Sequence, residues 1–547
     1  MSSTFNPSRR RFLAQTSLAT LALASVPSWL QAMEGMNKLP PNKASASFHP
    51  DVEIDLTCQP STATILPGQA TRVLRYSAKL IKGPANSVSE IPSSYLGPIL
   101  RFETGQKIRI NLLNLLDEPS ITHWHGLHVP AEMDGSPMYA IDKGQRFVYE
   151  FEMRNRASMN IYHPHPHGIT GRQVYQGLAG AIIVNDDEER HLQLPSGEYE
   201  IPLVIQDRQF DDQNQLQYAG HMHDRMMGFY GDQILVNGKP NATFNLASRA
   251  YRLRILNGST ARIYKLAWDD NSPITVIGTD GGLLEAPLNK AYVMLAPGER
   301  IDVWADFSGR KVGSQLVMRS LAFSGALPMM GMMGMGGRRG GHGMGMGMHG
   351  GMHNRVQQDD TQMGSDYPIL TININRQVSD SPSLPKQLST IKHFSLADVS
   401  NPKQPLPIAI SEAPMAMLLN GRAYAENDLQ AFERVPLNSI QLIEIFHSNS
   451  SHGMGGMGGG MMAMAHPIHL HGQYFQIFSR QQTKPSDAYN SVKDGFIEGG
   501  WKDTVLVMPG EEVRIIKPFQ DFKGLFMYHC HNLEHEDMGM MREFSVE

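Results

Sequence analysis

Cysteine is scarce in this chain of 547 residues, which contains only two. Cys58 and Cys530 lie near opposite ends of the sequence, so no disulfide framework holds the chain together. We expect Cys58 to be a buried small hydrophobe, the alternative being a second functional thiol. Stability must then come from hydrophobic cores, and the length is sufficient for roughly three or four domains.

Long apolar runs and basic runs are also missing after the N-terminus. No later segment is predicted to span a bilayer, and a formal net charge of −5 argues against nucleic acid as a partner. Residues 1–32 are different, because three consecutive arginines at 9–11 precede an apolar stretch that Pro27 interrupts. We interpret residues 1–32 as a twin-arginine signal peptide that directs the chain to the periplasm, the alternative being a basic disordered N-terminus.

Long amphipathic helices are few, and strand patterns dominate. Residues 142–151, 296–304 and 508–516 share a Gly-containing turn followed by alternation of apolar and polar residues, which predicts a half-buried antiparallel strand in each. A further strand-like segment precedes each copy, at 107–111, 251–257 and 441–446. The threefold repeat predicts an all-β protein of three related β-sandwich domains, at 45–192, 195–377 and 395–547.

Methionine, glycine and histidine are abundant, at 34, 51 and 22 residues. Many of the methionines and glycines lie in an insertion at 328–354 of the second domain and in a second tract at 452–464. Thioethers prefer cuprous ion, so these tracts would gather or admit Cu(I). The alternative is a flexible insertion whose methionines absorb oxidant damage.

Residues 529–540 combine ligands for two kinds of metal site in one tract. On an extended strand, His529 and His531 face one way and Cys530 faces the other. The thiolate of Cys530, the imidazole of His535 and the thioether of Met540 can then meet on the second face. With one more imidazole, this is the ligand set of a blue-copper electron-transfer site.

Paired histidines occur four times, two pairs in the first domain and two in the third. A single pair would mean little, but four pairs, one of which flanks a cysteine, predict a metal cluster. The middle domain has no such pair near its repeat and is expected to be a spacer. The motifs are His123-Trp124-His125, His163-Pro164-His165-Pro166-His167, His466-Pro467-Ile468-His469-Leu470-His471 and His529-Cys530-His531.

On these four motifs the chain resembles the three-domain multicopper oxidases, of the bacterial periplasmic cuprous oxidase and laccase type. The resemblance implies three cupredoxin-like Greek-key β-sandwich domains and four copper ions. Eight imidazoles for three of these ions, four from each outer domain, imply a cluster at the interface between those domains. The implied ligands are His466, Cys530, His535 and Met540 for type 1 copper, His123 and His469 for type 2 copper, and His125, His163, His165, His471, His529 and His531 for the type 3 pair.

One pair remains open from the residues alone, because alternation could present either His163 and His165 or His165 and His167. The resemblance favours the first choice, since Tyr162 stands where the family has an aromatic residue. It also implies that Asp134 and Glu536 relay protons, the alternatives being a simple Asp-Gly turn and a solvated loop acid.

The resemblance implies a substrate Cu(I) site shortly before His466, where copper-efflux oxidases carry an acidic residue and a methionine. This chain has Met462 and Met464 at those positions, so the acid is missing. We expect an exported monomer that reduces dioxygen to water with electrons from Cu(I) and so contributes to copper tolerance. Phenol, ferrous or manganous oxidation and copper sequestration are the rivals.

Overall fold

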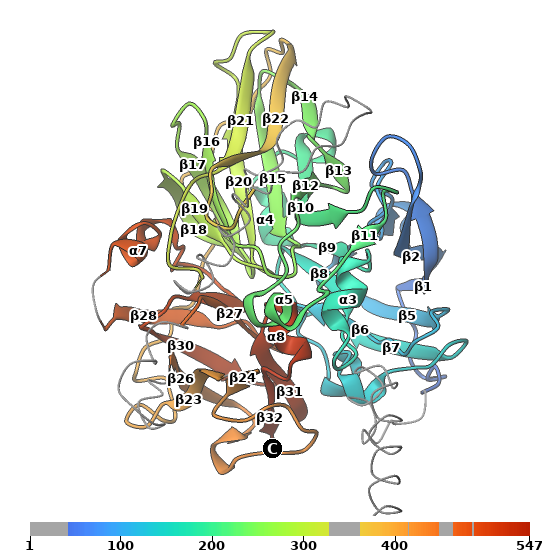
Figure 1. Cartoon of the computed structure of the whole chain (residues 1–547), viewed down its shortest axis with the longest axis vertical. Helices are drawn as coiled ribbons and strands as arrows, with labels where there is room; N and C mark the ends of the chain where they lie inside the picture. Colours follow the sequence, from blue (N-terminus) through green and yellow to red (C-terminus); the bar gives the residue numbers. More distant parts are fainter. Residues whose placement is uncertain (1–41, 328–360, 414, 448–462, 484–485) are drawn as a thin grey trace, which may run out of the picture.

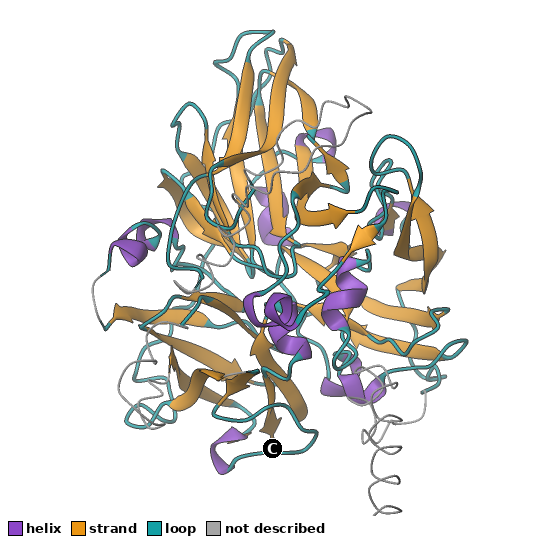
Figure 2. Ribbon diagram, in the orientation of Figure 1, coloured by secondary structure: helices purple, strands orange, loops and turns teal. Residues whose placement is uncertain are grey.

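The computed structural model describes residues 42–327, 361–413, 415–447, 463–483 and 486–547. Strands dominate this part of the chain, and the helices are short (Figure 2). No helix among these residues has the length and apolar character needed to cross a membrane. The predicted signal peptide, 1–32, lies outside the described residues. The α-helices are α3 (Thr170–Tyr175), α4 (Asp187–His191), α5 (Met222–Met227), α7 (Asp487–Asn490) and α8 (Leu533–Asp537).

The N-terminal strands form two sheets around one core. Their orders are β2-β1-β5-β7 and β3-β4-β9-β8-β6, and the core takes buried side chains from both sheets, among them Ile54 and Ile182. Cys58 is fully buried in this core and is free, as predicted. The strands are β1 (Val52–Ala63), β2 (Thr71–Lys82), β3 (Val88–Ser89), β4 (Ile99–Glu103), β5 (Lys107–Asn114), β6 (Thr122–His125), β7 (Arg146–Glu152), β8 (Ser158–Pro164) and β9 (Gly180–Asn185).

The middle strands form a second sandwich. One sheet has the order β13-β12-β10-β15-β20-β17-β18, with β11 paired to β10, and the other has the order β14-β22-β21-β16-β19. The antiparallel pair β21–β22 flanks the predicted insertion at 328–354, which lies outside the described residues. The strands are β10 (Glu200–Phe210), β11 (Leu216–Gln217), β12 (Gln233–Val236), β13 (Lys239–Pro240), β14 (Thr243–Ala247), β15 (Ala250–Asn257), β16 (Tyr264–Trp268), β17 (Ile274–Thr279), β18 (Gly282–Lys290), β19 (Val293–Leu295), β20 (Arg300–Asp306), β21 (Gln315–Ser320) and β22 (Tyr367–Arg376).

The C-terminal strands form the third sandwich, with sheets β24-β23-β26-β30-β28 and β25-β32-β31-β27-β29. Its core contains Cys530 and Met540, both fully buried. The strands are β23 (Leu406–Ala413), β24 (Ala416–Leu419), β25 (Arg434–Val435), β26 (Ser439–His447), β27 (His466–Leu470), β28 (Gln476–Gln482), β29 (Thr504–Val507), β30 (Glu511–Phe519), β31 (Gly524–Cys530) and β32 (Met541–Val546).

One pairing scheme occurs three times. A parallel pair (β1–β5, β10–β15, β23–β26) is followed in the same sheet by an antiparallel pair (β5–β7, β15–β20, β26–β30). The predicted strand repeat is therefore confirmed, and the strands of the three sandwiches span residues 52–185, 200–376 and 406–546. The predicted half-burial is wrong for the middle copy, 296–304, where β20 is buried except at Asp306. Asp302 of β20 pairs with Arg252 and Arg254 of β15, which makes the burial of these charges possible.

The three sandwiches form a triangle (Figure 1). The first, in blue to cyan, and the third, in orange to red, lie side by side below the second. Helices α3 and α8 contact each other where the first and third sandwiches meet. Strands β6 and β8 of the first sandwich thus face β27 and β31 of the third.

Candidate metal centres

Strand register brings the four histidine pairs together. The pairing of β6 with β8 places His123 opposite His163, and the pairing of β27 with β31 places His469 opposite His529. The second member of each pair follows two residues later, on the same face. All eight side chains are buried: His123, His125, His163, His165, His469, His471, His529 and His531.

The imidazole rings meet across the interface between the two outer sandwiches. The rings of His123 and His471 stack with centroids 3.8 Å apart, and those of His125 and His469 with centroids 3.7 Å apart. His165 and His529 approach with their Nε2 atoms 3.4 Å apart. The structure therefore brings all eight predicted cluster histidines into one interdomain site.

Backbone carbonyls fix the tautomer of four rings. Nδ1 of His123 lies 2.6 Å from the Asp134 carbonyl oxygen, and Nδ1 of His163 lies 2.9 Å from that of Pro164. His469 and His529 direct Nδ1 in the same way at the carbonyl oxygens of Asp503 and Cys530. A carbonyl oxygen only accepts, so each Nδ1 carries the proton and each Nε2 presents a lone pair.

No hydrogen-bond donor of the protein reaches these lone pairs. Nε2 of His123, His163 and His469 is buried without a hydrogen-bond partner. Nδ1 of His471 donates to the Asp134 carboxylate at 2.7 Å, so Nε2 of His471 also carries a lone pair. This atom lies 3.2 Å from Nε2 of His529. Two lone pairs that face each other at this distance need a cation between them. The donor set therefore fits metal ions that accept neutral imidazole.

Burial keeps five of the cluster imidazoles in the form that binds metal. It lowers the pKa of His163 and His469 to about 3 and holds the pKa values of His125, His165 and His471 well below the usual range. Neutral imidazole is the ligand form, so protons do not compete with a metal at neutral pH.

Two of the buried acids at the cluster were predicted. Asp134 contacts the rings of His123 and His471, and burial raises its pKa. Glu536 lies 3.0 Å from Nδ1 of His529 and 3.7 Å from Nε2 of His165. Burial favours its neutral form, but these imidazoles outweigh burial and hold its pKa well below the usual range. Neither carboxylate is solvated, as both residues are about 2 % exposed.

A third acid, Asp503, was missed. Its Oδ1 lies 3.0 Å from Nε2 of His125, and Arg300 holds both of its carboxylate oxygens at 2.6–2.7 Å. Arg300 also donates to the Met159 carbonyl and to Asn160, so it contacts the first and third sandwiches from the second. In the sequence Asp503 is an isolated acid with no motif around it, and only the fold reveals its role.

The middle sandwich supplies none of the eight histidines, but it is more than a spacer. Gly298, in the turn before β20, has φ +83° and lies so close to the cluster that a Cβ there would meet the ring of His125 at 3.0 Å. The same Cβ would lie 3.1 Å from the ring of His531. Glycine at this position lets the middle sandwich close against the histidines.

The second predicted site lies on the other side of Cys530. Nδ1 of His466 and Nδ1 of His535 approach Cys530 Sγ at 3.4 and 3.6 Å. Nε2 of His466 donates to Glu412 at 3.0 Å, and Nε2 of His535 donates to the Met226 carbonyl at 3.1 Å. Both Nδ1 atoms therefore present lone pairs to the sulfur. Burial raises the pKa of the thiol, so a thiolate here requires a cation beside it.

Met540 belongs to the same buried core as Cys530, and its carbonyl accepts a hydrogen bond from the Cys530 amide at 3.0 Å. Met464 is buried near His466, whereas Met462 lies outside the described residues. His167, the alternative ligand in the first domain, packs its ring against Tyr424. It is absent from the groups of metal-compatible side chains found among the described residues.

The sequence also failed to predict an acid at the edge of the cysteine site. Glu412, at the end of β23, contacts the His466 ring, the Met464 amide at 3.0 Å and Nδ1 of His447 at 3.7 Å. The His447 side chain is 7 % exposed, and neither ring nitrogen has a hydrogen-bond partner. Glu412 thus supplies a carboxylate that the sequence around His466 lacks.

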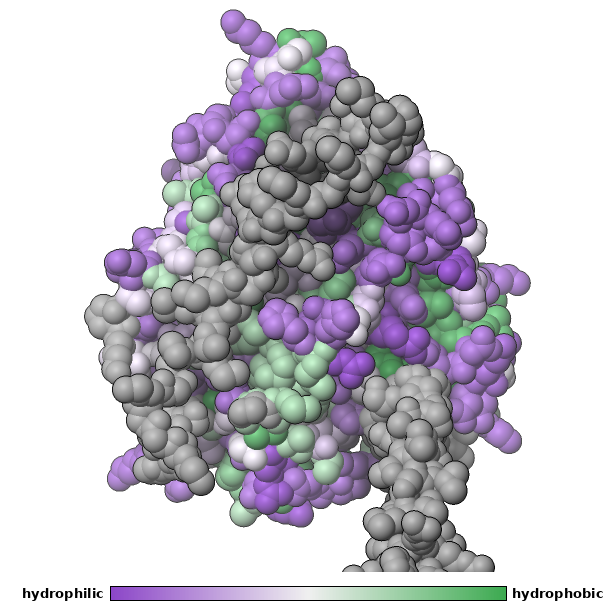
Figure 3. All heavy atoms as spheres, viewed as in Figure 1, coloured by the Kyte–Doolittle hydropathy of each residue, from purple (hydrophilic) through white to green (hydrophobic). Residues whose placement is uncertain are grey.

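Helix α5 covers the same site from the middle sandwich. It contacts α8, and its Met226 and Met227 pack against the core that contains Cys530. Met222 on the same helix is 46 % exposed, and Met415 is 69 % exposed. Figure 3 shows a pale green, moderately apolar area where Figure 1 places α5 and α8.

Comparisons with known proteins agree with this geometry. Two family models, both described as multicopper oxidase, match residues 73–189 and 412–547. The multicopper oxidase mco of Staphylococcus haemolyticus is 30% identical over 451 residues, 82% of each chain. A laccase of Bacillus subtilis is 28% identical over 461 residues, 78% of this chain and 79% of the laccase. The crystal structure of the McoA multicopper oxidase from Aquifex aeolicus superposes with a TM-score of 0.71 at 29% identity, covering 93% of this chain and all of that one.

Proposed function

Because this chain belongs to the multicopper oxidase family, we propose that it couples one-electron oxidation of cuprous ion to four-electron reduction of dioxygen to water. Membership in the family makes it an oxidoreductase that uses dioxygen and a reducing substrate. The identity of that substrate, the ligand assignment and the cellular site are the proposal.

The residues would hold four copper ions. Bound copper supplies reversible one-electron exchange at the thiolate and multi-electron reduction of dioxygen at the histidine cluster. The observation that carries this assignment is the set of buried lone pairs that face one another, above all His471 and His529 at 3.2 Å. The ligands are His466, Cys530, His535 and Met540 for type 1, His123 and His469 for type 2, and His125, His163, His165, His471, His529 and His531 for type 3.

Cys530 joins the two sites covalently. Its neighbours His529 and His531 belong to the cluster, while its own sulfur belongs to the site of His466 and His535. A path of a few bonds through the backbone therefore separates the place where an electron enters from the place where it is used.

Asp134 and Glu536 are proposed to supply protons. Each carboxylate is buried and contacts two imidazoles of the cluster, so a proton that it takes up is within reach of the reduction site. Because its pKa is low, Glu536 would pass a proton on rather than store one. Asp134 contacts His123 and His471, whereas Glu536 contacts His529 and His165. Protons would therefore reach the cluster by two separate routes. Asp503, held by Arg300, orients His125 and His469 instead.

Cuprous ion is favoured by the side chains around the cysteine site. Glu412 and His447 provide charge and an imidazole at its edge, and Met226 and Met227 of α5, which pack against the core that contains Cys530, provide thioethers. Soft thioether and imidazole ligands select Cu(I). A role in copper tolerance follows, in the periplasm, for a monomer exported through its predicted signal peptide, 1–32.

Phenol oxidation is the second candidate, because the Bacillus subtilis relative is a laccase. Ferrous or manganous oxidation would use the same electron path with a different donor. Copper sequestration alone would not need Cys530 to link two ligand sets, and it is the least favoured rival.

Oxygen uptake by the copper-loaded protein tests the proposal. Cu(I), Fe(II), Mn(II) and a phenol are supplied in turn, and the kcat/KM values are compared. We expect the highest value with Cu(I), and a variant that replaces Glu412 with Gln should lower it more for Cu(I) than for the phenol. A higher value with the phenol than with Cu(I) would assign the chain to the laccase alternative.

A further inference from the structure

A cleft of about 380 Å³ opens at the surface where the first and third sandwiches meet the segment that links the second sandwich to the third. This volume is in the range of small-molecule sites. None of the residues that line the cleft belongs to the histidine cluster or to the site of Cys530. The lining includes Arg154 and Arg156 after β7, Lys392 and Phe394 between β22 and β23, and Trp501 before β29.

The lining of this cleft is cationic, in a chain whose formal net charge is −5. Arg154, Arg156 and Lys392 line it, and no acidic side chain of the described residues does. Each arginine pairs with one exposed carboxylate outside the lining, Arg154 with Asp521 at 3.2 Å and Arg156 with Glu188 at 3.0 Å. Lys392 is exposed and forms no ion pair within the described part of the chain. The cleft therefore carries positive charge that the protein itself does not neutralise.

Flat rings form the apolar part of the lining. Phe394 and Trp501 pack edge to face, with ring centroids 5.7 Å apart and their planes at 77°. Gln476 holds the linking segment in place, since its amide donates to the Lys392 carbonyl at 2.7 Å and its Oε1 accepts from the Phe394 amide at 2.8 Å. The ammonium and the aromatic ring thus extend from a backbone that is fixed before a ligand binds, which reduces the entropic cost of binding.

Tyr474, which also lines the cleft, connects it to the histidine cluster. Its hydroxyl accepts from Nδ2 of Asn155 at 2.9 Å and donates to Oδ1 of Asn160 at 2.8 Å. Asn160 also accepts from Arg300 at 3.1 Å, and Arg300 holds Asp503 beside the cluster. The Tyr474 hydroxyl is therefore already engaged, and the polar partners left for a ligand are the cations.

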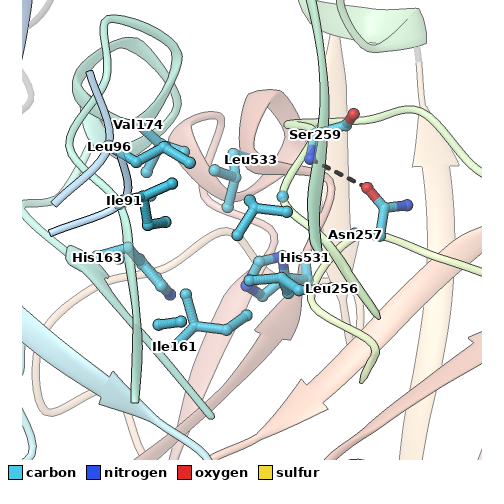
Figure 4. A pocket seen from close by; sticks show the side chains of 15 residues that line it. Ile91, Leu96, Ile161, His163, Val174, Leu256, Asn257, Ser259, His531 and Leu533 are labelled. Atoms are coloured by element: carbon cyan, nitrogen blue, oxygen red, sulfur yellow. Dashed lines mark hydrogen bonds between the residues drawn. The ribbon is translucent and has the colours of Figure 1, made fainter. Parts of the chain in front are cut away.

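A smaller cavity, where the three sandwiches meet, serves as a contrast (Figure 4). Apolar side chains such as Leu96, Val174 and Leu256 line it, and its lining contains no Lys, Arg, Asp or Glu. An organic anion would find neither room nor an opposite charge there. The surface cleft provides both.

We propose that the surface cleft binds an aromatic carboxylate, whose charge pairs with the cations and whose ring packs against Phe394 and Trp501. Guanidinium and ammonium groups form charge-assisted hydrogen bonds with carboxylates, and aromatic rings pack well against one another. An uncharged ring would leave the cations without a partner, and an aliphatic or inorganic anion would leave the rings uncovered. The site goes beyond the proposed function, because its residues are not those assigned to copper or to the electron donor.

Isothermal titration calorimetry of the copper-loaded chain with naphthoate tests the site without turnover. We expect one molecule to bind per chain, with a Kd at least roughly tenfold lower than for two probes that each lack one feature. Naphthalenemethanol has the ring without the charge, and acetate has the charge without the ring. Binding of naphthoate should weaken as the salt concentration rises, because exposed charges are screened. No binding of naphthoate, or equal binding of naphthalenemethanol, would overturn the proposal.

Two substitutions locate the bound naphthoate. Lys392→Gln removes the unpaired cation and should raise Kd roughly tenfold, the effect of losing one charge-assisted contact. Phe394→Leu keeps an apolar side chain but removes the flat ring, and should raise Kd about threefold. The matched control is Lys386→Gln, because Lys386 is exposed in the same linking segment and does not line the cleft. An unchanged Kd in Lys392→Gln, or an equal rise in the control, would refute this cleft as the site.

Discussion

At the scale of residues, the protonation of single imidazoles determines the chemistry. Backbone carbonyls accept from Nδ1 of His123, His163 and His469, and the lone pairs on Nε2 remain. At Cys530 the arrangement is reversed, because Glu412 and a carbonyl take Nε2 and leave Nδ1 for the metal. The two sites thus lie back to back on one strand, and these three cluster rings present Nε2 where the rings beside Cys530 present Nδ1.

Replacement of Cys530 by Ser tests the thiolate. The hydroxyl is a hard ligand, so we expect the intense copper–thiolate absorption to disappear and kcat to fall roughly 1,000-fold or more, as for a group that acts in every turnover. Visible spectra and oxygen uptake measure both effects. Cys58→Ser is the matched control, since Cys58 is buried in the first core. This variant should retain both the copper–thiolate absorption and the turnover. Turnover that survives in Cys530→Ser would refute the electron path.

Replacement of the buried acids tests proton delivery. Glu536→Gln and Asp134→Asn keep hydrogen-bonding capacity but cannot carry a proton, so kcat should fall about 10²–10⁴-fold with the copper–thiolate absorption retained. A solvent isotope effect on kcat larger than in the native enzyme is expected. If kcat falls only in proportion to lost copper, the two acids merely position the histidines.

At the scale of elements, short strands bring each pair of histidines to one face. The period of two and the repeated turn–strand segments were sufficient to predict three sandwiches. They left the choice between His163/His165 and His165/His167 open, and the full set of eight cluster histidines came from the resemblance to multicopper oxidases. Asp503, Arg300, Glu412 and His447 could not be predicted, because each reaches the sites from a strand or turn distant in sequence. Their positions depend on how the sheets pack, and no local pattern encodes that packing.

The Met- and Gly-rich segment is the element whose function the sequence suggests most directly. Deletion of residues 329–352 should raise KM for Cu(I) roughly tenfold, the effect of losing about 1.4 kcal/mol of binding, with a much smaller change for a phenol. The flanking strands β21 and β22 pair with each other, so a short Gly-Ser linker should preserve the fold. Equal KM values before and after deletion would remove the case for a copper-gathering role.

At the scale of the whole molecule, Arg300 connects the three sandwiches. From β20 it reaches Asn160 in the first and Asp503 in the third, and it is about 1 % exposed. A bidentate pair of this kind is lost even with lysine, whose single ammonium cannot span both oxygens.

Replacement of Arg300 by Met should therefore weaken the assembly of the cluster. The Asp503 carboxylate would remain buried without its partner, at a cost of about 3–5 kcal/mol in unfolding free energy. Denaturant titration and copper content per chain measure the two consequences. The exposed Arg434 pairs with Glu547, and Arg434→Met is the control. It should change the unfolding free energy by no more than about 1 kcal/mol and leave the copper content unchanged. Native stability and full copper content in Arg300→Met would contradict the role assigned to this residue.

The stoichiometry of oxygen consumption tests the central claim most directly. Known amounts of Cu(I) are added to the copper-loaded chain in air-saturated buffer, and dioxygen and hydrogen peroxide are measured. An oxidase that reduces dioxygen fully at the interdomain cluster consumes one dioxygen for four Cu(I) and leaves no peroxide beyond the level of protein-free buffer. Consumption of one dioxygen for two Cu(I) with peroxide as the product, or no consumption above the protein-free rate, would contradict the account.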